Sequence, residues 1–417
     1  MTRFWALLPC VLAGALAAQS FEEEFRRGLL ALSANDLSQA RQSLESASRL
    51  QPDNSMVWAA LAQAYLRGKE AALAREAADR ASRLAPPDSP VRHALAMFYS
   101  ETGDFQKAAD AERRYASSPG SDPESAARAA DLSLRAGEAA LAVVWAETAL
   151  HRADTARAHH LLGQAYAAVN RPNDAERELR AAVDRDPQLE AYAFDLGQVQ
   201  LRRGDFAGAA ATLKKACRSF PGSAQIQLAY GVAAYGQRRF DLAIDAFLRV
   251  IRIDPSIEQP YLFLSRLLDQ AGDRLPQVVA AYAAWERMTP DGYLPVCLHA
   301  KALSAASGDS PVIEGKLRRS IQLNGQYWES HYELGALLMN QRKWPEAAAE
   351  LSRAIALNPK HPPAHFQLAR VYDKLGKAEL AQAERAEHQR LTAAETSAGQ
   401  AVPLAIPTPA GKDKPLP

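Results

Sequence analysis

Histidine pairs are the residues of this sequence that come closest to a chemical site. His159 and His160 are adjacent, and His361 and His365 are four residues apart, a spacing that can place two metal ligands on one face of a helix. Two prolines between His361 and His365 interrupt that turn. We therefore expect His159, His331 and His365 to be packing residues with one satisfied ring nitrogen, and not metal ligands.

The residue spacings that mark common catalytic sites do not occur in this sequence. HExxH, GxSxG, GxxxxGK[ST], CxxC and GxGxxG are all missing, and the carboxylates are scattered, usually beside arginine. We expect no enzyme activity, no catalytic residue, no cofactor and no metal. Lysine and arginine number 49 against 48 acidic residues, so there is no net basic field and we expect no nucleic-acid partner.

The elements that position these residues are predicted to be helices in a repeated hairpin, of which Glu329–Lys360 is the clearest copy. Apolar residues at helical spacing predict a first helix, and Pro345 opens a second one after a short polar break. Pro359 ends it, because proline cannot continue the hydrogen-bond ladder. The small residues Gly335 and Ala347 would let the two helices approach closely.

The hairpin recurs with a period of 33 to 35 residues along the chain. Stepping from Ala347 reaches Ala40, Ala74, Ala108, Ala142, Ala175, Ala209, Ala243, Val278, Ile313 and Ala381, so nine of eleven marks are alanine. Proline often follows the mark by twelve residues, and glycine or alanine precedes it by twelve. One hairpin cannot bury its apolar face alone, so we expect the copies to stack on one another.

The repeat resembles the tetratricopeptide repeat family, whose pattern is W…LG…Y…A…F…A…P over 34 residues. The matching residues of one copy are Trp58, Leu61, Ala62, Tyr65, Ala74, Ala81 and Pro86. The resemblance implies an all-α fold, an α-solenoid of about eleven helix-turn-helix repeats in a right-handed superhelix over residues 19–391. We place the repeats near 21–54, 55–88, 89–122, 123–155, 156–189, 190–223, 224–257, 258–292, 294–327, 328–361 and 362–391.

The resemblance also implies that the fifth residue of each first helix faces a concave groove for a protein or peptide partner. With the positions four residues further on, and Tyr235, the predicted groove residues are Phe194, Gln198, Leu228, Val232, Tyr235, Leu262, Arg266, Leu298, Tyr332, Phe366 and Arg370. The Lys/Asn clamp of some family members is missing from these positions. We expect a non-enzymatic scaffold or adaptor.

Two other interpretations of these residues stay open. The fifth-position side chains can instead pack between neighbouring first helices. Alternatively, the protein is an envelope polysaccharide assembly or glycan-binding factor in which Tyr332, Phe194 and Tyr235 stack on sugars.

The two ends of the sequence differ in composition from the repeats. Residues 1–18 combine a basic flank, a short apolar run and the small-residue pattern Ala15-Leu16-Ala17, which predicts a secretory signal peptide. We expect an exported protein of a bacterial envelope, periplasmic or secreted, with no membrane span after cleavage; an uncleaved anchor is the alternative. Residues 392–417 are rich in proline and predict a disordered tail. The oligomeric state is not predicted.

Two further features bear on the middle of the chain. Cys217 and Cys297 lie about three repeats apart, roughly 25–30 Å for packed helices, so we expect no disulfide between them. Residues 273–315 contain an extra residue, two misplaced helix breakers and Lys301 where a small residue belongs. We expect a local change of stacking there.

Overall fold

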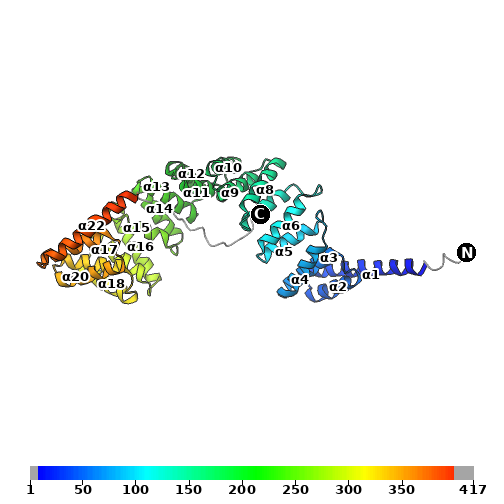
Figure 1. Ribbon diagram of the computed structural model, residues 1–417, viewed down its shortest axis with the longest axis horizontal. Coiled ribbons are helices and arrows are strands. Elements are labelled where there is room, and N and C mark those ends of the chain that lie inside the picture. Colours follow the sequence, from blue (N-terminus) through cyan, green and yellow to red (C-terminus); the bar gives the residue numbers. More distant parts are fainter. Residues whose placement is uncertain (1–7, 399–417) are drawn as a thin grey trace. The chain divides into compact units, whose positions relative to one another are not determined.

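Every regular element in the described part of the chain is a helix. The computed structural model describes residues 8–398 (Figure 1). The elements are α1 (Leu8–Ser33), α2 (Leu37–Leu50), α3 (Ser55–Arg67), α4 (Ala71–Leu84), α5 (Val91–Glu101), α6 (Phe105–Ala116), α7 (Ser125–Arg135), α8 (Ala139–Arg152), α9 (Ala156–Ala168), α10 (Pro172–Arg185), α11 (Glu190–Arg202), α12 (Phe206–Ser219), α13 (Ala224–Gly236), α14 (Phe240–Ile253), α15 (Gln259–Ser265), two 3-10 helices (Leu268–Gln270 and Gly272–Arg274), α16 (Leu275–Met288), α17 (Tyr293–Ala305), α18 (Ser310–Leu323), α19 (Trp328–Asn340), α20 (Trp344–Leu357), α21 (Pro362–Lys374) and α22 (Ala378–Ala398). The predicted all-α class is confirmed.

The helices are arranged as hairpins, each with an odd-numbered first helix and an even-numbered second helix. Each helix packs mainly against its neighbours along the chain, and consecutive first helices such as α17, α19 and α21 also touch. Such nearest-neighbour packing is the organisation of a solenoid, as predicted. The contacts divide the chain into a first unit, residues 1–195, and a second unit, residues 196–417. The handedness of the superhelix stays a prediction.

The turn inside each hairpin contains one residue in the left-handed backbone region. The residues with positive φ in the described chain are Asn35, Lys69, Gly103, Gly137, Asn170, Gly204, Arg238, Gly272, Ser307, Arg342 and Gly376. Glycine adopts this conformation freely, whereas a residue with a Cβ is disfavoured by about 1–2 kcal/mol. The same turn therefore recurs in each hairpin, even where Lys69 or Arg342 has to adopt the left-handed conformation.

Close packing within the hairpins depends on a glycine that faces a large residue sixteen positions later. A Cβ on Gly335 would lie 2.7 Å from Leu351 Cγ, and one on Gly163 would lie 2.6 Å from Leu179 Cγ. The same relation joins Gly28 with Leu44, Gly197 with Leu213 and Gly231 with Phe247. Gly335 thus allows the close approach as predicted, with Leu351 as the side chain that it faces, and Ala347 is fully buried.

The eighth hairpin is irregular. Its first helix, α15, has only 7 residues and is followed by two 3-10 turns that end at Arg274. Arg274 Nη2 donates to Asp245 Oδ2 on α14 at 2.9 Å, which ties the last turn to the preceding hairpin. The predicted change of stacking within 273–315 stays a prediction, and α17 and α18 in that range are regular helices of 13 and 14 residues. The irregular segment is therefore 266–274.

The helices at the two ends extend past the predicted boundaries. α1 runs without a break from Leu8 to Ser33, through the predicted cleavage region. α22 runs to Ala398, so the first residues of the predicted disordered tail, 392–398, are helical, because the last helix continues past Leu391. The rest of the tail and residues 1–7 lie outside the described part. Within residues 8–398, no helix combines the length and the apolar character that crossing a membrane requires.

Candidate functional site

In five repeats the fourth residue of the repeat carries a hydrogen-bond donor that reaches the preceding loop. Trp58 Nε1 donates to the Pro52 carbonyl at 2.8 Å, and Tyr261 Oη donates to the Pro255 carbonyl at 3.2 Å. The same bond is made by Arg92 Nε to Pro86 at 3.2 Å, His331 Nε2 to Gly325 at 3.3 Å and His365 Nε2 to Pro359 at 3.0 Å. In each case the acceptor lies six residues earlier. In these five repeats the position therefore ties the hairpin to the loop that leads into it.

The three histidines predicted to be packing residues occupy this position, and both of their ring nitrogens have partners. Nδ1 contacts a glutamate of the second helix of the same hairpin, at 2.7 Å for His159 and 2.6 Å for His365. His331 Nδ1 lies 2.7 Å from Glu350. Among the described residues, no group of three or more His, Cys, Asp or Glu side chains is arranged to hold a metal ion. The histidines are thus more fully bonded than we expected.

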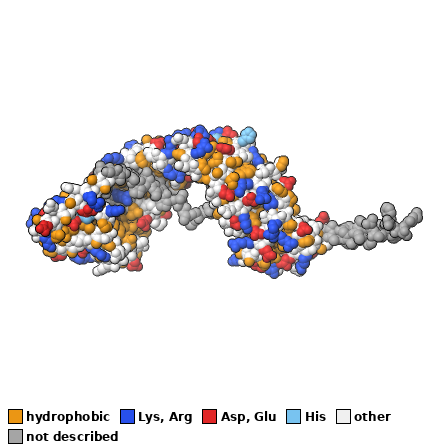
Figure 2. Space-filling view, viewed as in Figure 1, with side chains coloured by type: hydrophobic (Ala, Val, Ile, Leu, Met, Phe, Trp, Pro, Cys, Tyr) orange, Lys and Arg blue, Asp and Glu red, His pale blue; other side chains and the backbone are white. Residues whose placement is uncertain are grey.

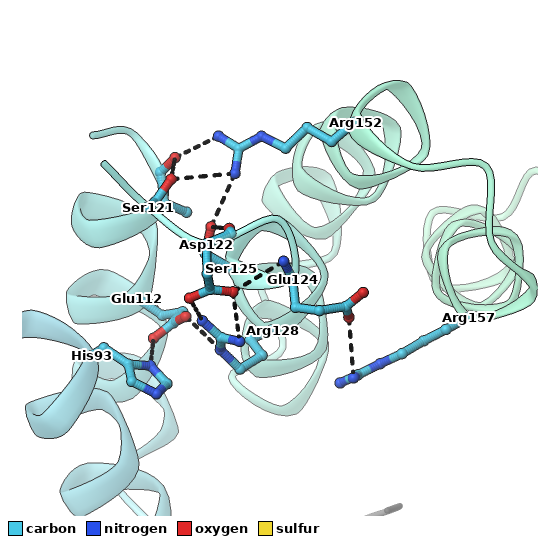
Figure 3. A network of polar contacts seen from close by, with 10 residues as sticks. His93, Glu112, Ser121, Asp122, Glu124, Ser125, Arg128, Arg152 and Arg157 are labelled. Carbon is cyan, nitrogen blue, oxygen red and sulfur yellow. Dashed lines mark hydrogen bonds and ion pairs between the residues drawn. The ribbon is translucent and has the colours of Figure 1, made fainter. Parts of the chain in front are cut away.

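The first unit contains a charged network around the long loop before α7 (Figure 3). Glu112 is 1% exposed and lies between His93 Nδ1 at 2.8 Å and Arg128 Nε at 2.8 Å. Arg128 Nη2 also donates to Asp122 at 2.6 Å. The hydrogen bond from Arg128 holds the pKa of the Asp122 carboxyl below the ordinary value. Arg152 Nη2 reaches the Ala116 carbonyl at 2.6 Å, so this network anchors the loop to α6, α7 and α8.

The second unit holds a half-buried charged cluster that the sequence did not reveal. Lys301 Nζ on α17 lies 2.6 Å from Glu329 Oε1 and 3.7 Å from Glu333 Oε1, both on α19. Tyr327 Oη donates to Glu329 Oε2 at 2.5 Å. The side chains of Lys301, Glu329 and Glu333 are 26%, 17% and 16% exposed. Lys301 is therefore not a packing fault but the cation that joins two neighbouring first helices.

Burial and charge act in opposite directions on the two carboxyls of this cluster. Burial raises the pKa of Glu333 to about 7, since the longer contact with Lys301 compensates only in part. For Glu329, burial also raises the pKa, but the attraction and hydrogen bond of Lys301 outweigh it and the pKa is lowered. Burial lowers the pKa of Lys301, and both glutamates more than restore it. The cluster thus holds one firmly ionised carboxylate and one that titrates near neutral pH.

Aromatic rings border this cluster at the start of α21. The His361 ring lies 4.5 Å from the Trp328 ring and 4.8 Å from the Tyr332 ring, centroid to centroid. His361 Nδ1 is buried without a hydrogen-bond partner. His365, four residues later, uses both nitrogens for Glu384 and the Pro359 carbonyl, so the two histidines do not act as a ligand pair.

The eleven predicted groove residues differ widely in exposure. Phe194, Leu228, Val232 and Leu298 are buried, whereas Gln198, Tyr235 and Tyr332 are half-buried. Leu262, Arg266, Phe366 and Arg370 are exposed. The exposed fraction is 36% for Leu262 and 47% for Phe366, and the Arg370 guanidinium lies 5.9 Å from the centre of the Phe366 ring.

The predicted groove residues therefore do not form a continuous apolar surface. A partner cannot touch Val232 or Leu298, because the two side chains are 0% and 1% exposed within the packing of α13 and α17 against their neighbouring helices. For the four buried members the interpretation as packing residues is the better one. Tyr235 packs against Phe240 and Phe263 at 5.8 and 5.5 Å, so its ring is not a free platform for a sugar. The exposed residues Leu262, Arg266, Phe366 and Arg370, with the half-buried Tyr332, lie on α15, α19 and α21, and we call these five the second-unit face. The half-buried Gln198 lies on α11, outside these helices.

Models of known protein families match the repeats of this chain. Models of the tetratricopeptide repeat match residues 25–89, 160–224, 194–256 and 338–388, together just over half of the chain. The chain belongs to the tetratricopeptide repeat family. Repeats of this family typically form interaction scaffolds and not enzymes. No curated protein matches the sequence.

Solved structures with the same kind of fold are distant in sequence. Yeast Tom70 has 14% identity and a TM-score of 0.38, with 90% of this chain and 92% of that chain covered. The C-terminal part of a TPR repeat-containing protein from Cytophaga hutchinsonii has 16% identity and a TM-score of 0.44, covering 66% of this chain and 98% of that one. YrrB, described as a TPR protein with an unusual peptide-binding site, has 17% identity and a TM-score of 0.37, covering 44% and 95%.

Proposed function

We propose that this tetratricopeptide repeat protein is a scaffold that binds an extended segment of a partner protein on the second-unit face. The observation that carries the proposal is the exposure of Leu262 and Phe366 at the two ends of four first helices that pack in succession, α15, α17, α19 and α21. In the row of fifth-position side chains on these helices, Leu262, Tyr332 and Phe366 are at least partly exposed, whereas Leu298 of α17 is buried, so a bound segment would pass over α17 without contacting it. An extended peptide can follow such a row, because alternate side chains of a strand point to the same side.

The side chains around the row indicate what the segment contains. Phe366 and Leu262 are apolar anchors, and large apolar contacts dominate peptide affinity. Arg266 and Arg370 are exposed beside them, and each guanidinium can bind a carboxylate by donating two N–H hydrogen bonds to its oxygens. Charged side chains of both signs are otherwise interspersed over the face drawn in Figure 2, in keeping with the net charge of +1. The expected segment has apolar residues separated by acidic ones.

A peptide library displayed on phage tests this proposal directly. We expect the chain to select peptides with apolar and acidic residues, and we expect the double variant Leu262→Ser, Phe366→Ser to lose at least about tenfold in affinity. Both side chains are exposed, so the variant should keep its helix content in circular dichroism. The matched control is Val312→Ser, since Val312 is 48% exposed on α18, a second helix of the same unit.

Two results would contradict the proposal. One is a selected peptide whose affinity falls as much with Val312→Ser as with the double variant. The other is saturable binding of soluble oligosaccharides in place of peptides, which would support the polysaccharide alternative.

Export is the second part of the proposal and is supported by the basic flank, apolar run and small residues of positions 1–18. Removal of this segment would leave α1 from Gln19 onward, which includes the buried Phe21 and the Gly28 that faces Leu44. We expect the protein recovered from an envelope fraction to begin at about Gln19 by N-terminal sequencing. Recovery of an intact Met1 terminus would contradict cleavage.

A further inference from the structure

A pocket of about 270 Å³ lies among α12, α13 and α14 of the second unit. It is separate from the second-unit face, and its walls come from two second helices and the first helix between them. Lys214 and Arg218 on α12 are four residues apart and so share a helix face, and Arg249 enters from α14. All three side chains are exposed toward solvent. The pocket therefore collects three cations from two helices.

The negative charge of the pocket is already paired. Asp245 is the carboxylate in its lining, and it accepts hydrogen bonds from Arg274 Nε and, at 2.9 Å, from Arg274 Nη2. Burial raises the pKa of the Cys217 thiol to about 11, so this group stays neutral. Burial likewise raises the pKa of the Tyr230 phenol, which remains a hydroxyl that can donate. The electrostatic balance of the pocket is therefore positive.

Gln227 supplies an independent observation. The residue is 1% exposed, it lines the pocket, and its side-chain Nε2 has no hydrogen-bond partner. Gln227 occupies the fourth position of its repeat, where Trp58 and Tyr261 donate to the carbonyl six residues earlier. The shorter amide does not make that bond. A buried donor left unpaired is costly, and Gln227 is a lining residue, so a rotation of its side chain that turns Nε2 toward the pocket would pair it with an acceptor bound there.

We propose that this pocket binds the phosphate group of an organic phosphate monoester. Two guanidinium groups, one ammonium group, an amide and a phenol are donors, so the ligand must bring several acceptor oxygens and more than one negative charge. A phosphate monoester has a charge of about −1.5 to −2 at pH 7 and three acceptor oxygens, whereas a carboxylate has one charge and two oxygens. Leu242 and Ala246 form an apolar part of the wall, against which the organic group of the ester packs.

Calorimetric titration of the full chain in a chloride buffer tests the site, with phenyl phosphate as the probe. We expect one saturable site, with weaker binding of inorganic phosphate and weaker still of benzoate. Arg249→Gln and Lys214→Gln should each weaken phenyl phosphate binding about tenfold, the expected effect of losing one charge-assisted hydrogen bond. Lys215→Gln is the matched control, because Lys215 is the exposed neighbour of Lys214 on α12 but is not part of the pocket lining.

Gln227→Leu, which removes the buried donor, should also weaken binding while the helix content is unchanged. If this variant fails to fold, the exposed Arg249→Gln variant decides the outcome alone. Three results would overturn the proposal: no saturable binding of phenyl phosphate, an equal effect of Lys215→Gln and Lys214→Gln, or inorganic phosphate binding as tightly as the ester. None of them bears on peptide binding by the second-unit face.

Discussion

At the scale of single residues, the Lys301, Glu329 and Glu333 cluster links neighbouring first helices through charge. Lys301 forms a 2.6 Å contact with Glu329 but a 3.7 Å contact with Glu333. One lysine cannot stabilise two half-buried carboxylates equally, so the nearer one stays ionised and the farther one holds its proton up to about pH 7. Stability should therefore depend on pH within this part of the solenoid.

Glu333→Gln tests this dependence. The ordinary glutamate pKa of 4.5 applies to the unfolded chain, and the folded pKa is about 7. Since the folded protein binds this proton more tightly, the free energy of unfolding should fall as pH rises from about 4.5 to about 7. At pH 8 the glutamine variant should be more stable by about 1–3 kcal/mol, and at pH 4 the two should be nearly equal. Thermal unfolding followed by circular dichroism at both pH values measures the difference.

Glu346→Gln is the control for that experiment, because Glu346 is exposed on the neighbouring α20. It should leave the pH profile of the native chain unchanged. A Glu333→Gln profile that is parallel to the native one from pH 4 to pH 8 would contradict the account of this cluster.

Lys301 also shows what a sequence can and cannot reveal about a site residue. Its position in the repeat identified it as unusual, because a small residue is expected there. The sequence could not show that Glu329 and Glu333 lie beside it, because these partners are 28 and 32 positions away and meet it only through the packing of α17 on α19. The sequence thus marks Lys301 as out of place in the repeat, and the structure shows that it pairs with two carboxylates of the next first helix.

At the scale of elements, the glycine that faces a large residue sets the separation of the two helices in a hairpin. Gly163→Ala would place a Cβ 2.6 Å from Leu179 Cγ, and Leu179 is fully buried and has no room to move. We expect a loss of about 1–3 kcal/mol in the free energy of unfolding, the usual cost of overpacking a core. Denaturant unfolding of the two chains measures it.

Gly315→Ala is the matched variant, because Gly315 lies within α18 and nothing is within 4 Å of its added Cβ. Alanine has the higher helix propensity, so this variant should gain about 0.5–1 kcal/mol. Equal effects of the two substitutions would show that contact with Leu179 does not limit the hairpin.

The irregular α15 segment should open more readily than its regular neighbours. Its single α-helical stretch has 7 residues and is followed by 3-10 turns, whose hydrogen bonds are weaker than those of an α-helix. Amide hydrogen exchange followed by mass spectrometry should show residues 266–274 exchanging at least about tenfold faster than α19 and α20. Equal protection of both segments would show that the irregular turns do not weaken the stack.

At the scale of the whole molecule, the period of the sequence was enough to predict the fold but not the binding surface. Alanine, glycine and proline recur at fixed spacing because every hairpin has the same turn and the same close contact, as Gly335 with Leu351 illustrates. Exposure at the fifth position does not follow from spacing. Leu298 is 1% exposed and Phe366 is 47% exposed at equivalent positions; α17 packs between the first helices α15 and α19, whereas α21 packs against α19 and no first helix follows it in the described chain.

The central claim is that the first helices of the second unit bind the partner. Hydrogen exchange of the full chain with and without a selected peptide tests it most directly, because every helix is observed in one experiment. The account predicts added protection in α15, α19 and α21 and unchanged exchange in α16, α18 and α20. Protection confined to those second helices, or to the first unit, would contradict it.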